Sequence, residues 1–242
     1  MAQLYSIEGN IGSGKSTLIN ALKHDNKIRG NSNIIFMEEP VSQWVNIKDN
    51  DGVNMIEKFY IDQNKYAFSF QMMAYITRLS MLKKCIRENP DAIIICERSL
   101  DTDKNIFAKM LYDEGKIESV NYQIYTNWFD EFVSDIPECG IIYVRTHPTT
   151  SYERVKKRDR KGETMPLSYL ENCHKYHEKW VESDKNFKLL LDGEKHREHM
   201  DDYNDWIEDI YKIIYGSNSA SVSSNSASFD TQTIQDLATI GC

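Results

Sequence analysis

Residues 4–17, LYSIEGNIGSGKST, combine an apolar run, a glycine-rich turn and the beginning of a run with helical character over 18–23. The spacing Gly9-x4-Gly14-Lys15-Ser16 matches the phosphate-binding loop at every fixed position. Glycines let successive backbone N–H groups point into one concavity, and a helix beginning near Lys15 adds the positive end of its dipole. Lys15 can reach the β- and γ-phosphates, and the Ser16 hydroxyl can bind Mg²⁺. The stretch therefore predicts a nucleoside triphosphate site formed by Gly9, Asn10, Ile11, Gly12, Ser13, Gly14, Lys15, Ser16 and Thr17.

The composition limits the classes of protein that the chain can belong to. Its 242 residues are 40% hydrophobic and 27% charged, which is ordinary for a globular protein with a full core. The net charge of −8 argues against general binding to nucleic acid backbones, and no apolar run approaches the roughly 20 residues of a membrane span. No secretory signal is apparent, and the five cysteines form no CxxC pair. We therefore expect a cytoplasmic protein that binds neither nucleic acid polymers nor membranes.

The pattern of apolar runs predicts the fold class. Four further strands are expected after the first, three of them nearly continuous apolar runs typical of buried parallel strands, at 34–37, 92–96, 140–144 and 187–191. Helices are expected between them at about 52–63, 66–88, 103–113, 118–134, 148–159, 166–184 and 201–214. This alternation predicts a three-layer α/β fold, with a five-stranded parallel sheet flanked by helices and ligands at the carboxyl ends of the strands.

The composition changes near the C-terminal end. Residues 216–228 are uncharged and rich in Ser, Asn and Ala, so they cannot bury a core. We therefore expect one domain over residues 1–215 and a flexible tail over 216–242.

Two acidic residues follow predicted strands. Glu39 precedes Pro40, which biases it away from helix and holds the carboxylate at an abrupt strand exit. Near a triphosphate this carboxylate could act as a general base; the alternative is an ordinary surface glutamate. Glu97 and Arg98 follow the strand at 92–96. Glu97 is placed like a carboxylate that faces Mg²⁺, and Arg98 could neutralise charge on a transferred phosphoryl group; the alternative is a structural ion pair.

A basic stretch precedes Pro166, containing Arg154, Lys156, Lys157, Arg158, Arg160 and Lys161. Three of its arginines lie within about one helical turn of one another and could converge on phosphates as a lid, namely Arg154, Arg158 and Arg160. The alternative is a solvated helix face. The histidine pairs 174/177 and 196/199 have i, i+3 spacing, but no cysteine or carboxylate cluster accompanies them in sequence, so a zinc site is not expected.

Together these residues resemble the deoxynucleoside kinase family over residues 4 to about 215. The phosphate-binding loop is shared with many proteins, whereas the more specific motifs are Glu39-Pro40-Val41 with Trp44, Phe70-Gln71 and Glu97-Arg98-Ser99. The resemblance implies a P-loop kinase fold with a lid segment, ATP as the phosphoryl donor, Mg²⁺ as the cofactor, and a homodimer formed through helices.

The resemblance also implies a role for each matching residue. Glu39, Arg98 and Lys15 would be catalytic, and Ser16 and Glu97 would bind Mg²⁺. Tyr60 and Glu163 would hold the 3′-hydroxyl and Gln71 would read the base edge, while the ring contacts would come from Trp44, Phe70 and Phe107. Two residues separate Glu163 from Pro166 where the family pattern has three, so the lid is shortened there.

The base preference is predicted from Ala74, Arg78 and Asp103, which match the family's positions at the far edge of the base. An Arg/Asp pair resembles members that prefer purines and cytosine, because a charged pair is poorly satisfied beside the thymine methyl group. We therefore expect phosphorylation of the 5′-hydroxyl of a purine or cytosine deoxynucleoside in nucleotide salvage. The alternatives are a nucleoside-monophosphate kinase of the thymidylate type and a nucleotide-dependent switch, although the guanine-reading Asn-Lys-x-Asp motif is absent.

Overall fold

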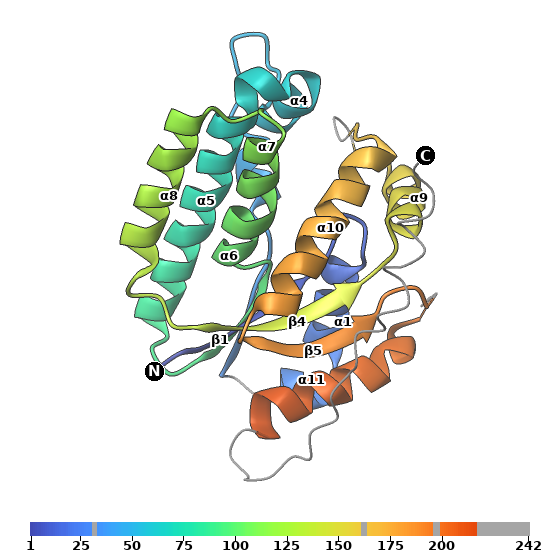
Figure 1. The fold of residues 1–242 in the computed structure, drawn as a ribbon. Coiled ribbons are helices and arrows are strands. Elements are labelled where there is room, and N and C mark those ends of the chain that lie inside the picture. Colours follow the sequence, from blue (N-terminus) through green and yellow to red (C-terminus); the bar gives the residue numbers. More distant parts are fainter. Residues whose placement is uncertain (31–32, 161–163, 196–198, 217–242) are drawn as a thin grey trace.

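A computed structural model describes residues 1–30, 33–160, 164–195 and 199–216. Five strands form one parallel sheet in the order β2-β3-β1-β4-β5. Their bounds are Gln3–Glu8 (β1), Ile34–Met37 (β2), Ile93–Glu97 (β3), Cys139–Arg145 (β4) and Phe187–Asp192 (β5). Helices cover both faces of this sheet (Figure 1). The predicted three-layer α/β fold with five parallel strands is confirmed.

The register of the central strands places the site. Ile7 of β1 lies opposite Glu97 of β3 and Ile142 of β4, so these three strands end at the same edge. The five residues of β3 and the last five of β1 are buried, which is why both read as apolar runs. The residues that follow β1, β2 and β3 therefore converge at the carboxyl edge of the sheet, where the sequence places the phosphate-binding loop and Glu39.

Alternate strand residues pack into two separate cores, as the two-residue period of a strand requires. On one face Ile93 and Ile95 pack with α1 (Lys15–His24) and α11 (Asn204–Gly216). On the other face Ile94 packs with α5 (Gln63–Glu88) and α8 (Ser119–Val133), and Tyr143 packs with α10 (Leu167–Ser183). Figure 1 shows α5 and α8 side by side on one side of the sheet and α1 and α11 on the other.

Shorter helices join these elements, and several differ from the prediction. The helix expected over 52–63 is α4 (Met55–Ile61), because Asn54 forms a capping box with Glu57. The long helix begins at Gln63 rather than 66, since the Asp62 side chain accepts a hydrogen bond from the Lys65 N–H. The stretch expected to begin at 201 is a 3₁₀ turn, Met200–Tyr203, before α11. Three further helices are α2 (Asn26–Arg29), α3 (Val41–Trp44) and α9 (Pro148–Arg158).

The helix expected over 103–113 is not a regular α-helix. It consists of α6 (Leu100–Thr102), a π-helical segment (Asp103–Ala108) and α7 (Lys109–Asp113). A π-helical segment closes wider turns than an α-helix and is often found at functional sites. Here it carries Asp103 and Phe107, both of which reach the site.

Within the described ranges, no helix has both the length and the apolar character that crossing a membrane requires.

Candidate active site

A cavity of about 720 Å³ opens at the carboxyl edge of the sheet. This volume lies in the range of small-molecule sites. Its phosphate-loop side contains Ile11, Gly12, Gly14, Lys15, Ser16 and Thr17. Its other walls contain Glu39, Trp44, Tyr60, Phe70, Gln71, Ala74, Glu97, Arg98, Asp103 and Phe107, together with Arg154, Arg158 and Arg160. Residues separated by up to about two thirds of the sequence therefore share one cavity.

The phosphate-binding loop depends on glycine at two close approaches. Gly9 has φ 143° and Gly12 has φ 81°, both in the region that side chains rarely adopt. A Cβ at Gly9 would lie 2.5 Å from the Val144 carbonyl oxygen, and one at Gly12 would lie 2.5 Å from the Ser151 carbonyl oxygen. The glycines thus let the loop pack directly against β4 and α9.

Lys15 is buried at the base of this loop. Its Nζ donates to the carbonyl oxygen of Asn10 at 2.6 Å. Burial and the neighbouring positive charge of Arg98 together lower the pKa of Lys15 to about 7, although three glutamates oppose this shift. A triphosphate in the cavity would supply the negative charge that the lysine lacks and would restore its proton.

Ser16 and Glu97 form an oxygen pair beside the loop. The Ser16 hydroxyl donates to Glu97 Oε1 at 2.6 Å, and both residues line the cavity. Mg²⁺ prefers oxygen ligands and is usually held by one or two carboxylates together with substrate phosphates and water. Among the described residues, no group of three or more His, Cys, Asp or Glu side chains could hold a metal ion. The pair therefore fits a Mg²⁺ ion that arrives with a nucleotide.

Glu39 lies between two arginines. Its Oε1 is 3.1 Å from Arg78 Nη2 and 3.5 Å from Arg98 Nε. Burial alone would raise the pKa of Glu39, but the positive charges of Arg98, Arg78 and Lys15 outweigh it and lower the pKa below its ordinary value. The carboxylate is therefore ionised at neutral pH and can accept a hydrogen bond from a hydroxyl group.

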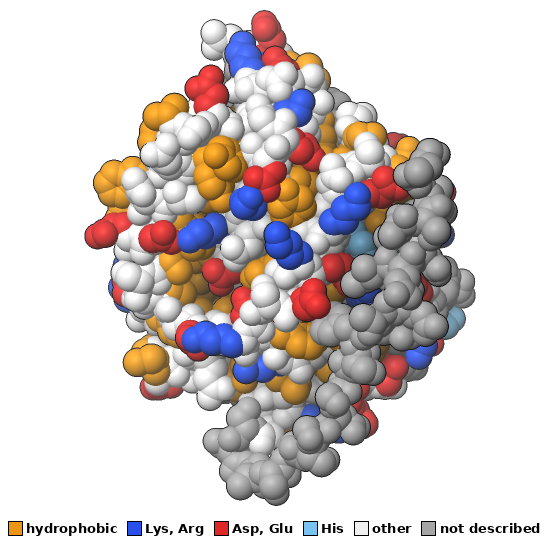
Figure 2. Space-filling view, viewed as in Figure 1, with side chains coloured by type: hydrophobic (Ala, Val, Ile, Leu, Met, Phe, Trp, Pro, Cys, Tyr) orange, Lys and Arg blue, Asp and Glu red, His pale blue; other side chains and the backbone are white. Residues whose placement is uncertain are grey.

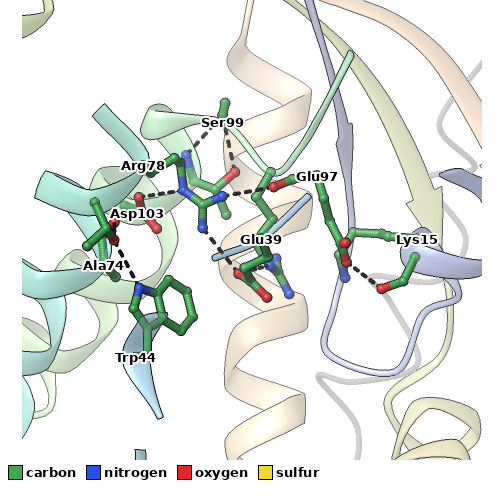
Figure 3. A network of polar contacts seen from close by, with 12 residues as sticks. Lys15, Glu39, Trp44, Ala74, Arg78, Glu97, Ser99 and Asp103 are labelled. Carbon is green, nitrogen blue, oxygen red and sulfur yellow. Dashed lines mark hydrogen bonds and ion pairs between the residues drawn. The ribbon is translucent and has the colours of Figure 1, made fainter. Parts of the chain in front are cut away.

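Arg78 connects Glu39 to two other parts of the site (Figure 3). Its Nε donates to Asp103 Oδ2 at 2.9 Å and its Nη1 donates to the carbonyl oxygen of Glu97 at 2.8 Å. The sequence prediction put Arg78 against the base, but it does not line the cavity: it lies behind Asp103 and Glu39. Burial raises the pKa of Asp103 even though Arg78 opposes the shift.

Aromatic rings form the opposite wall. Phe70 stacks on Phe59 with ring centroids 4.5 Å apart and meets the edge of Trp44 at 5.8 Å. The Trp44 indole N–H donates to the Thr77 hydroxyl at 2.9 Å, which fixes the ring. Gln71 is buried here, and its Oε1 has no hydrogen-bond partner within the protein. A ligand that enters between these rings would meet a free amide oxygen.

The predicted lid arginines lie at the rim. Arg154 is on α9 and donates from Nη1 to the Gly193 carbonyl oxygen at 2.9 Å. The helix ends at Arg158, and Asp159 follows with φ 46°, a left-handed conformation that turns the chain. Arg158 and Arg160 also line the cavity. Glu163 lies outside the described residues.

Comparison with known proteins agrees with this geometry. The model of the family described as deoxynucleoside kinase matches residues 5–215. The chain belongs to the deoxynucleoside kinase family. It is 38% identical over 190 residues to a fowlpox virus protein named probable deoxycytidine kinase, covering 77% of this chain and 74% of the relative. It is 33% identical to human mitochondrial thymidine kinase 2, covering 80% and 72%, and 34% identical to chicken deoxycytidine kinase 2, covering 73% and 72%.

Members of this family are phosphotransferases, so this chain is a kinase, as the sequence motifs predicted. The structure brings most of the predicted site residues to one cavity, but four of the described ones do not line it, namely Gly9, Asn10, Ser13 and Arg78. Asn10 instead donates from Nδ2 to the Leu170 carbonyl oxygen at 2.8 Å and so joins the loop to α10.

Six further residues line the kinase cavity that were not predicted as site residues: Glu38, Val41, Ser42, Ile56, Phe59 and Tyr169. Ile56 and Phe59 are three residues apart on α4, so they form one helix face. That spacing is a signal, but it equally describes an ordinary core face. Only the position of α4 beside α5 shows that this face lines the cavity and is not an ordinary core face.

Proposed function

We propose that this kinase transfers the γ-phosphoryl group of ATP to the 5′-hydroxyl of a deoxynucleoside in nucleotide salvage, with a purine or cytosine base preferred over thymine. The observation that carries the proposal is the position of Glu39. It follows β2 and lies in the same cavity as the phosphate-binding loop, Arg98 and the aromatic wall. A hydroxyl group held by the Glu39 carboxylate would face the terminal phosphate of a nucleotide in the loop.

The charge on the acceptor side favours a nucleoside over a nucleoside monophosphate. Arg78 is matched there by two carboxylates, Glu39 and Asp103. An acceptor phosphate would need unmatched cations, whereas a hydroxyl needs an acceptor such as Glu39. Lys15 and the rim arginines line the other side of the cavity, where the phosphates of ATP would lie.

The chemistry then follows from these positions. Glu39 orients the 5′-hydroxyl and takes its proton as the new oxygen–phosphorus bond forms and the bond from the γ-phosphorus to the bridging oxygen of the departing ADP breaks. Lys15, Arg98 and the rim arginines stabilise the negative charge that spreads over the transferred group. Mg²⁺, held by Ser16 and Glu97, would supply further positive charge to the phosphates.

The base preference rests on the wall around Gln71. The amide of Gln71 offers both a donor and an acceptor, so it can pair with the edge of any base. Discrimination would come from Asp103 in the cavity wall and from Arg78 behind Asp103, because a buried charged pair is poorly satisfied beside a methyl group. This supports deoxyadenosine, deoxyguanosine or deoxycytidine over thymidine.

The test is product formation from ATP and Mg²⁺ with each of the four deoxynucleosides and, in parallel, with their monophosphates. We expect monophosphate from the purine and cytosine nucleosides and little from thymidine. If thymidine is the best substrate, the proposed phosphorylation of a deoxynucleoside stands and the proposed base preference is refuted. Turnover of monophosphates alone would refute the proposal and make the chain a nucleoside-monophosphate kinase.

We also propose that the kinase is a homodimer. The outward face of α8 supports this, because four apolar residues at four-residue intervals are each 41–57% exposed, namely Val120, Ile124, Trp128 and Phe132. Figure 2 shows hydrophobic side chains at the left edge of the molecule, where Figure 1 places α8. A stripe of this kind usually marks an interaction surface.

Light scattering after size-exclusion chromatography would test the dimer, since one chain has a mass of 28.2 kDa. We expect twice this mass for the wild type and the single mass for Ile124→Glu with Trp128→Glu. A wild-type monomer at micromolar concentration would refute the dimer.

Two further proposals concern the extent and location of the kinase. The family match to residue 215 supports one catalytic domain over 1–215, and we propose that residues 216–242 are a tail outside it. The cysteines that the structure describes are free thiols, which supports a cytoplasmic location.

A further inference from the structure

Glu8 is a buried acid that none of the expected site motifs includes. It is the last residue of β1, and its side chain has no exposed surface. Oε1 accepts a hydrogen bond from the Ser99 backbone N–H at 2.8 Å, and Oε2 accepts one from the Thr102 hydroxyl at 2.5 Å. Both oxygens thus bind the turn that follows β3, which is more than 90 residues away in the sequence.

That turn holds Arg98 in an uncommon conformation. Arg98 has φ 64°, in the left-handed region, which non-glycine residues seldom adopt unless surrounding contacts hold them there. Its backbone N–H donates to the Ile7 carbonyl oxygen at 3.2 Å and its Nη1 donates to the Gly9 carbonyl oxygen at 2.8 Å. Residues 7, 8 and 9 therefore each accept a hydrogen bond from the segment that carries Arg98.

The conformation of this turn decides where the guanidinium lies. From it, Arg98 reaches Glu39 at 3.5 Å and lies over the Phe107 ring, 4.9 Å from the centroid. The backbone bond from Arg98 to Ile7 extends the strand ladder, and Glu8 binds the turn beyond the left-handed residue. Without it, the N–H of Ser99 would lose the partner that holds the far side of the turn.

We propose that Glu8 is a positioning residue for phosphoryl transfer, which acts by fixing the turn that holds Arg98. This inference rests on the proposed function for its effect on catalysis. Its structural part, the fixed turn, does not depend on which substrate the kinase uses.

Two variants separate this role from burial of an acid in general. Glu8→Leu fills the same space but cannot accept a hydrogen bond. Glu8→Gln keeps one carbonyl oxygen for the Ser99 N–H, and its amide can donate to the Thr102 hydroxyl oxygen, so the turn is retained. Glu182→Leu, at an exposed position on α10, is the matched control. Thr102→Val removes one of the two bonds and serves if Glu8→Leu does not fold.

Amide hydrogen exchange, read by NMR or by fragment-resolved mass spectrometry, measures the turn directly. We expect the Ser99 amide to exchange at least about tenfold faster in Glu8→Leu than in the wild type, with α8 unchanged and Glu8→Gln close to the wild type. Unchanged exchange at Ser99 in Glu8→Leu would overturn the proposal, even if no substrate had been found.

Kinetics then test the effect through Arg98. Because removing one donor to a transition state costs about 10²–10³ in kcat, we expect Glu8→Leu to lower kcat by about 10–100-fold, with KM for ATP nearly unchanged and Glu8→Gln largely restoring kcat. With Arg98→Ala already present, Glu8→Leu should cost less than about threefold. If the double variant instead loses kcat by the product of the two single losses, the link between Glu8 and Arg98 is overturned. An inactive wild type would instead refute the proposed function.

Discussion

Replacing Arg78 by Met tests the buried charge network most directly. Arg78 pairs with Asp103, whose side chain is 3% exposed, and with Glu39, which is 23% exposed and keeps Arg98 as a partner. Removing the Arg78 charge therefore affects mainly Asp103, which would remain buried without a counter-charge. Removing one partner of a buried pair typically costs about 3–5 kcal/mol.

Protonation of Asp103 limits this cost. The carboxyl group can escape its charge by binding a proton, which costs about 1.4 kcal/mol for each pH unit above its ordinary pKa of 3.8. The loss attributable to Asp103 is thus at most about 4 kcal/mol at pH 7 and about 2 kcal/mol at pH 5.5.

The sign of the pH dependence follows from the same argument. Burial already raises the folded pKa of Asp103 above its unfolded value, and removing Arg78 raises it further. The folded state then binds more protons than the unfolded state above pH 3.8, so stability falls as the pH rises toward the folded pKa. Arg78→Met should therefore be more destabilised at pH 7 than at pH 5.5, relative to the wild type.

The assay is urea or thermal unfolding at both pH values. For a domain of this size, a loss of about 3 kcal/mol corresponds to a fall in Tm of about 6–12 °C. Arg87→Met, on the exposed face at the end of the same helix, is the control and should stay within about 0.5 kcal/mol of the wild type. A loss below about 1 kcal/mol for Arg78→Met at both pH values would refute this account of the network.

Four other predictions follow from the site. Glu39→Gln should lower kcat by about 10²–10⁴ with the fold intact, and activity within a few-fold of the wild type would exclude Glu39 as the general base. Arg78→Met with Asp103→Ala should shift the ratio of kcat/KM toward thymidine; an unchanged ratio would remove the pair from specificity. Because the pKa of Lys15 is about 7, ATP binding at pH 8 should take up a proton, visible as a buffer-dependent calorimetric enthalpy that Lys15→Met abolishes. Removing residues 217–242 should leave kcat unchanged, and a large loss would make this segment functional.

The phosphate-binding loop and the sheet could be predicted from the sequence because their signals are local. The spacing of Gly9, Gly14 and Lys15 is fixed by what one turn of backbone must do around a phosphate. The runs of β1, β3 and β4 are apolar because both faces of each strand are covered. Glu39 and Glu97 could be selected because parallel strands bring their carboxyl ends to one edge.

Side-chain partners over long separations could not be predicted in this way. The family resemblance pairs Arg78 with Asp103, 25 residues away, but nothing in the neighbourhood of Arg78 on α5 indicates that it also binds Glu39, 39 residues away. The π-helical segment over 103–108 has the apolar spacing of a helix, so periodicity alone does not reveal its wider turns. Glu8 reads as the end of a strand because its role depends on the turn after β3.

The distribution of charge links these long-range contacts to the proposed reaction. On the donor side, Lys15, Arg154, Arg158 and Arg160 line the cavity, and burial lowers the pKa of Lys15, which the negative charge of a polyphosphate would raise. On the acceptor side, Arg78 is matched by Glu39 and Asp103. A phosphorylated acceptor would meet two carboxylates there, and the cation that lines the cavity beside them, Arg98, is already paired with Glu39. The same carboxylates that balance Arg78 thus favour an uncharged nucleoside, and Glu39 serves both purposes.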